Sequence, residues 1–132
     1  MSCYETISRY LYNKLSTILD IPVYNNIQEN KQNSKYCVFF ILDGTPTKYI
    51  ANNTAFTEFD IRINIWSPNS YEYDDLESII SQMDGEQAIT ITNGNDTGFI
   101  LSVRYTRQNS MVDDGWFGLQ VEFAIRTQDI TI

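Results

Sequence analysis

The stretch AFTEFDIRINIW, Ala55–Trp66, decides the fold of this chain of 132 residues. Apolar side chains occupy every second position from Phe59 to Ile65, and charged or polar side chains lie between them. A period of two with a single apolar face is typical of a β-strand that packs one side on a core and turns its other side to polar surroundings. The tripeptide Ser67–Pro68–Asn69 follows directly and ends the predicted strand.

Two segments place their apolar residues at helical spacing. Tyr4–Leu19 predicts an amphipathic surface helix, which stops before Pro22 because the residue that precedes a proline avoids the helical region. A second helix is predicted from Ser70 to Met83, with Asn69 as its N-cap and Glu72, three residues later, as the reciprocal partner. One helix therefore precedes the central strand in the sequence and the other follows it.

Further strands are expected on either side of these elements. Tyr36–Asp43 is an unbroken apolar run, which suits a strand covered on both faces. Phe99–Tyr105 and Trp116–Thr127 alternate like the central strand, and Val23–Tyr24 and Ala88–Thr92 are short. The expected loops and turns are Asn25–Lys35, Gly44–Asn53, Asn93–Gly98 and Gln108–Gly115.

These elements predict a single α+β domain over residues 1–132. Two amphipathic helices are expected to pack on one face of a mixed, mainly antiparallel sheet, in the order α-β-β-β-α-β-β-β. The sequence has no internal repeat and no linker that would divide it.

The charge of the chain disfavours nucleic acid as a tightly held partner. Its formal net charge is −8 and its pI is about 4.3, whereas proteins that grip nucleic acid do so mainly through Lys and Arg contacts to phosphate. Arg104 and Arg107 come closest to a basic patch, and we expect both to be exposed on a strand. An acidic wall beside which DNA slides remains compatible with this charge.

Residues that carry chemistry are missing or have simpler explanations. The chain contains no histidine, no phosphate-binding glycine loop and no calcium-loop pattern. Asp74, Asp75 and Glu77 lie early in the second predicted helix, where the helix dipole stabilises negative charge. Asp113 and Asp114 precede a turn glycine, where Asp is favoured. We therefore predict a protein that is not an enzyme and that needs no cofactor or metal.

Cysteine usage and hydropathy bear on location. Cys37 lies in the apolar run and is expected to be buried, and Cys3 is expected to be a free thiol near the terminus. No secretory signal opens the chain, and the run Cys37–Leu42 is far shorter than a membrane-spanning helix requires. We expect the protein to be made in the cytoplasm.

Two apolar clusters fall in predicted loops and are candidates for a partner interface. Met111, Val112 and Trp116 lie in or beside one predicted turn, and Tyr49 and Ile50 lie in the Gly44–Asn53 loop. Exposed apolar clusters with Trp, Tyr and Met often mark protein–protein sites. The alternative is that these loops fold back over the edge of the sheet.

Three features together resemble the tail-completion, or tail-terminator, proteins of long-tailed phages. The first is the amphipathic helix followed by the short strand Ile21–Tyr24 and a polar loop. The second is the strand–loop–strand unit Tyr36–Trp66 placed directly before a helix. The third is the final hairpin, in which Asp113–Gly115 leads into Gly118–Phe123.

The resemblance implies a virion protein that forms a ring, usually of six copies, at the head–tail joint. Such a ring caps the tail tube, docks onto a neck or portal-side connector protein, and lets DNA pass through without sequence-specific binding. The Gly44–Asn53 loop would then contact the lumen or the tube, with Lys48, Asn52 and Asn53 as channel-facing candidates. Tyr49, Ile50, Met111, Val112 and Trp116 would be candidates for contacts between subunits or with the neck.

Other functions remain open at this level. Another neck or connector ring of the virion would have the same order of elements. A small bacterial binding module would need a concave pocket with convergent polar groups. A hydrolase would have to rely on Asp74 or Asp113.

Overall fold

The computed structural model of the chain describes residues 1–26, 34–51 and 54–131, with backbone only for 43–51, 54, 55 and 129–131. In chain order the elements are α1 (Cys3–Ile18), β1 (Val23–Asn25), β2 (Tyr36–Ala51), β3 (Thr54–Ser67), α2 (Tyr73–Met83), β4 (Gln87–Asn93), β5 (Asp96–Asp113) and β6 (Trp116–Thr131). This order confirms the predicted α-β-β-β-α-β-β-β arrangement. No helix among the described residues is long and apolar enough to cross a membrane.

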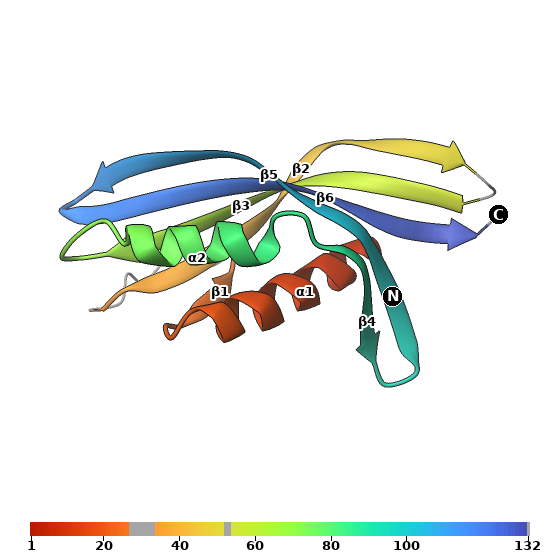
Figure 1. The fold of residues 1–132 in the computed structure, drawn as a ribbon, viewed down its shortest axis with the longest axis horizontal. Helices are drawn as coiled ribbons and strands as arrows, with labels where there is room; N and C mark the ends of the chain where they lie inside the picture. The colour runs from red at the N-terminus through yellow and green to blue at the C-terminus, as the bar shows by residue number, and fades with distance from the viewer. Residues whose placement is uncertain (27–33, 52–53, 132) are drawn as a thin grey trace.

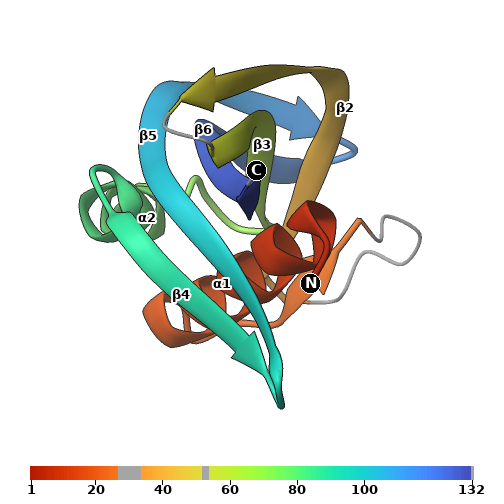
Figure 2. The same ribbon diagram turned by 90° about the vertical axis from the view of Figure 1, so that its right-hand side faces the viewer.

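The strands form a mixed sheet with the order β1-β2-β3-β6-β5-β4. β1 runs parallel to β2, and every other neighbouring pair is antiparallel. Both helices lie on the same side of the sheet, while β4 and the first part of β5 bend down to pack along α1 (Figures 1 and 2). The predicted α+β class, with two helices on one face of a mainly antiparallel sheet, is therefore confirmed.

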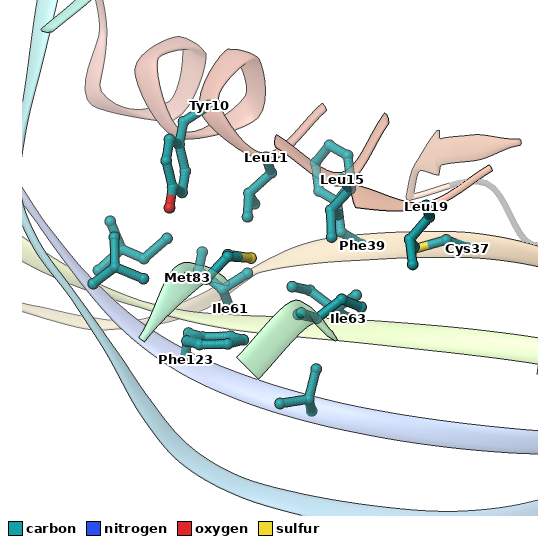
Figure 3. Close-up of a cluster of buried hydrophobic side chains, with 14 of the residues drawn as sticks. Tyr10, Leu11, Leu15, Leu19, Cys37, Phe39, Ile61, Ile63, Met83 and Phe123 are labelled. Carbon is teal, nitrogen blue, oxygen red and sulfur yellow. The ribbon is translucent and has the colours of Figure 1, made fainter. Parts of the chain in front are cut away.

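The core fills the space between the helices and the inner face of the sheet, as Figure 3 shows. α1 contributes Ile7, Leu11 and Leu15, and Leu11 and Leu15 point toward Ile61 and Ile63 of β3. Phe123 and other buried apolar residues of β6 complete the inner face of the sheet. α2 adds Leu76, Ile79 and Met83 to the core. The alternation that predicts the central strand therefore sets its inner face correctly. Cys37 is fully buried as predicted, and burial raises the pKa of its thiol.

The prediction of a loop over Gly44–Asn53 is wrong for the residues that the structure describes. β2 continues to Ala51 and pairs with β3 through Lys48, Tyr49 and Ile50. A register shift between Leu42 and Thr47 absorbs the residues around Pro46. Long-range pairing with β3 outweighs the local turn preferences, and a bulge takes up the residues that do not fit the ladder.

The predicted turn Gln108–Gly115 is also too long. β5 runs to Asp113 and only Asp114 and Gly115 form the turn, with φ angles of 54° and 80°. Two successive residues with positive φ form the tight hairpin turn whose twist matches that of the strands. Polar residues of this segment form a strand because β6 supplies the pairing partner. The turn at Asn93–Gly98 shortens for the same reason, to two residues.

The start of the second helix differs from the prediction. α2 begins at Tyr73, and Glu72 occupies the N-cap position without a side-chain cap hydrogen bond. Asn69 does not cap the helix; its backbone N–H donates to Ser67 Oγ at 3.3 Å in the preceding turn. α1 is capped as the rules expect, because Ser2 Oγ accepts from the backbone N–H of Glu5 at 3.0 Å.

Gly98 allows α1 to approach β5 closely. A Cβ atom added at Gly98 would lie 2.0 Å from Thr6 Oγ1 and 2.9 Å from Thr6 Cγ2. Thr6 is 2% exposed, so its side chain has no open space into which it could move. The close packing of α1 on β5 therefore depends on a glycine at position 98.

We predict that Gly98→Ala lowers the free energy of unfolding by about 1–3 kcal/mol, because the new methyl group overpacks the contact with Thr6. Urea denaturation measures the change. Adding Thr6→Ala should recover part of the loss, since it removes both clashing atoms. Equal destabilisation in the single and double variants would contradict the proposed contact.

Candidate partner-binding face of the sheet

The outer face of the sheet, on the side away from the helices, carries rows of side chains across four strands. Strand register places Tyr36, Trp66, Gly118 and Met111 side by side. The next two rows are Val38, Asn64, Gln120 and Asn109, and then Phe40, Arg62, Glu122 and Arg107. These positions alternate with the core residues Ile61, Ile63 and Ile65, so their side chains lie on the opposite face.

Aromatic side chains gather at one end of this face. The Trp66 ring lies over Gly118, where an added Cβ would be 2.7 Å from the ring and 2.9 Å from Met111 Cγ. The Trp116 ring packs edge-on against Tyr36 with centroids 5.9 Å apart, and Tyr24 also packs edge-on against Tyr36, at 6.1 Å. We call Tyr24, Tyr36, Trp66, Met111 and Trp116 the aromatic cluster.

A groove of about 400 Å³ runs from this cluster across the outer face. Its lining is aliphatic and aromatic toward β2 and polar at its centre. The lining residues are Tyr36, Val38, Phe40, Leu42, Arg62, Asn64, Trp66, Met111, Asp113 and Gln120. An apolar groove with a few polar groups at its centre is the usual form of a recognition site.

Two polar atoms at the centre of the groove are buried without a hydrogen-bond partner in the described structure. They are Arg62 Nε, a donor, and Asn64 Oδ1, an acceptor. Asn64 is only 8% exposed, so water has little access to its side chain. Leaving a buried donor or acceptor unpaired costs about 1–3 kcal/mol. The described structure carries this cost beneath the groove, since neither atom is accessible to solvent.

The charged row beside the groove is organised around Glu122. Its side chain is 11% exposed and accepts a hydrogen bond from Arg107 Nε at 2.5 Å. This hydrogen bond and the negative charge of Glu122 raise the pKa of the Arg107 guanidinium. Gln120 Nε2 also donates to Glu122, at 3.4 Å. The contact with Arg107 holds the carboxylate toward β5, although Arg62 lies directly opposite Glu122 in the ladder.

The structure brings together two of the interface residues expected from the sequence. Met111 and Trp116 are half-buried members of the aromatic cluster, whereas Val112 is 60% exposed and alternates with Met111 to the inner face. Arg104 and Arg107 are exposed on β5, as expected.

Three of the other sequence candidates lie toward the far end of the β2–β3 hairpin. Lys48, Tyr49 and Ile50 belong to β2, and only their backbone is described. Asn52 and Asn53 lie outside the described residues.

Sequence reasoning missed Tyr36, Trp66, Arg62 and Asn64. A signal was present for Trp66, which occupies a position on the polar side of the alternating strand Ala55–Trp66. The unbroken apolar run from Tyr36 also indicated that β2 has apolar side chains on both faces. The convergence of these residues depends on strand order, which local patterns do not contain.

The described carboxylates do not converge on a metal site. Within the described ranges, no three Cys, Asp or Glu side chains converge so as to hold a metal ion. Asp74 and Asp75 lie in the first turn of α2, as expected for helix-dipole stabilisation.

Comparison with known proteins adds one finding about the fold. The sequence matches no protein family model and no curated protein. Among solved structures, a chain from the virion of a native gene transfer agent particle is similar, with a TM-score of 0.61 and 12% sequence identity. The alignment covers 96% of this chain and 95% of that chain. The two chains therefore share a fold over nearly their whole lengths.

We predict that Gly118→Val displaces Trp66 from its position over β6, because the new side chain would occupy the space of the indole ring. In a Trp116→Phe background, tryptophan fluorescence should shift to the red as Trp66 enters water. The clash should also lower the free energy of unfolding of Gly118→Val. Replacing Trp66 with Leu in that chain should restore most of the loss. Unchanged emission in the Gly118→Val variant would show that the ring does not lie over Gly118.

We predict that Asn64→Leu leaves the free energy of unfolding unchanged or raises it by roughly 1 kcal/mol, because it removes an unpaired buried acceptor. Urea denaturation provides the measurement, and Asn109→Leu, in the same row but exposed, is the matched control. A loss of more than about 2 kcal/mol would mean that the Asn64 side chain has a stabilising partner.

Proposed function

We propose that this chain is a structural protein of a tailed phage or phage-like particle, which forms a ring at the head–tail joint and completes the tail. The observation that carries the proposal is the likeness of nearly the whole chain to a component of a gene transfer agent virion. The resemblance of its sequence features to tail-completion proteins supports the more specific position at the end of the tail.

The proposed ring is built from copies of this one domain, six or more, and sits between the tail tube protein and a neck or portal-side connector protein. The net charge of −8 supports this placement, since a wall that repels phosphate lets DNA pass without adhering. The ring acts by assembly and not by catalysis. The protein is made in the host cytoplasm and ends in the virion.

The outer face supplies the contact surface that such a role requires. Trp, Tyr, Met and Arg are enriched where proteins bind each other, and the aromatic cluster and groove place these residue types together. We assign this face to a neighbouring virion component, with Met111 and Trp116 at one end of the contact.

The candidates on the β2–β3 hairpin fit the same arrangement. Tyr49 and Ile50 would contact the neighbouring subunit or the tube, and Lys48, Asn52 and Asn53 would face the channel. Val112 completes the set of proposed interface residues at the opposite end of the sheet.

Gold-labelled antibody on purified particles tests the proposed position. Label confined to the head–tail junction is the expected result. Label elsewhere on the particle would move the protein to another structural role, and its absence from particles by mass spectrometry would reject a virion function altogether.

We predict that Trp116→Ala reduces the yield of infectious particles on the order of tenfold, the effect of losing about 1.4 kcal/mol from a contact. Tyr12→Ala is the matched control, because Tyr12 is an aromatic residue on α1 that is 51% exposed and outside the groove. Complementation of a particle lacking the protein measures the yield. Equal yields for both variants would remove Trp116 from the interface.

A further inference from the structure

The outer half of β5 is an open strand edge. On one side β5 pairs with β6 from Phe99 to Asp113, with register shifts at Ile100/Ser102 and Tyr105/Arg107. On the other side β4 reaches only as far as Ser102, and Asp84 Oδ1 accepts from the Tyr105 backbone N–H at 2.8 Å. From Arg107 to Asp113, no described strand pairs with that edge.

The hairpin turn shows which backbone groups point outward. In a two-residue turn, the flanking residues Asp113 and Trp116 form a hydrogen-bonded pair. Hydrogen-bonded and non-hydrogen-bonded pairs then alternate along an antiparallel ladder. The N–H and C=O groups of Gln108, Ser110 and Val112 therefore point away from β6, and all three residues are exposed.

This segment lacks the usual protection of an edge. Natural edge strands carry prolines, lysines or bulges that prevent another strand from pairing. Between Gln108 and Val112 the sequence is Gln-Asn-Ser-Met-Val, and its register with β6 is uninterrupted. The segment is thus free to accept a strand in the same antiparallel geometry.

We propose that the edge of β5 pairs with the same edge of a second copy of this chain, antiparallel about a two-fold axis at Ser110. In this register Ser110 lies opposite Ser110 of the second copy. Gln108 lies opposite Val112 of the second copy, so every outward-pointing backbone group in this segment finds a partner.

Shape on the inner face supports this self-pairing. A cavity of about 310 Å³ lies beside the edge, lined by Tyr73, Leu76, Gln108, Asn109, Ser110 and Leu119. Val112 is 60% exposed and its side chain lies on the same inner face. The two-fold register brings Val112 of the second copy next to Gln108, at the mouth of this cavity. Each copy thus offers an exposed apolar side chain and a hollow that can receive it.

Charge on the outer face supports the same register. Arg107 lies opposite Asp113 of the second copy, and the symmetry repeats this opposite-charge pair. Arg107 uses its Nε–H for Glu122, its side chain is 71% exposed, and a guanidinium has further N–H donors for a second carboxylate. Opposite charges directly across a strand pair are stabilising.

This dimer would form before the protein assembles into the particle. A two-fold contact uses the same surface on both copies and closes on itself, whereas a ring requires two different surfaces. The dimer therefore goes beyond the ring proposed above and does not depend on it. Because the contact is short, we expect a reversible dimer that dissociates when the tail end offers a larger interface.

Sedimentation velocity of the purified chain tests the proposal at about 100 µM, where mass action favours even a weak dimer. We expect a species of twice the 15.3 kDa chain mass, and Ser110→Pro should sediment as a folded monomer. The proline removes an outward N–H and no bond to β6. Ser110→Ala keeps that N–H and should remain a dimer. A wild-type monomer, a ring, or a dimeric Ser110→Pro variant would overturn the proposal.

Val112→Glu provides a second test that leaves the backbone of β5 unchanged. It should also give a folded monomer, because the new carboxylate would lose hydration on entering the cavity of the second copy. If Ser110→Pro fails to fold, this variant decides, and a dimeric Val112→Glu chain would overturn the proposal. The particle-labelling experiment is independent of both variants, so the dimer and the proposed virion role can fail separately.

Discussion

The pairing of β3 with β6 is the constraint on which the rest of the structure depends. It aligns Ile61, Ile63 and Ile65 with Phe123, Val121 and Leu119, and this apolar surface is covered by both helices. Because side chains alternate along a strand, the same register determines which residues are left on the other face. A shift of one residue would bury the charged side of β3 and expose its isoleucines.

The outer face follows from this register. Trp66 lies over Gly118 because the two residues are partners in the ladder, and only a glycine leaves room for the ring. Arg62 and Asn64 lie in the middle of the groove because they alternate with buried isoleucines. Their unpaired polar atoms reduce the stability of the chain.

The two ends of the sheet differ in what they offer. At one end the long β2–β3 hairpin extends beyond the helices, and at the other the β5–β6 hairpin leaves an open edge (Figure 1). A subunit with distinct surfaces at opposite ends can make the different contacts that a ring requires. The aromatic cluster lies near the second end, beside the residues that form the tight turn at Asp114 and Gly115.

Sequence patterns alone determined the order and type of the elements, the inner face of the central strand and the burial of Cys37, because these depend on local periodicity and hydrophobicity. They could not locate the ends of β2 and β5, where pairing with β3 and β6 turned predicted loops into strands. They singled out Met111 and Trp116 but not Tyr36, Arg62 or Asn64. Only the tertiary structure decided that these residues share one groove, because strand order joins positions that are far apart in the sequence.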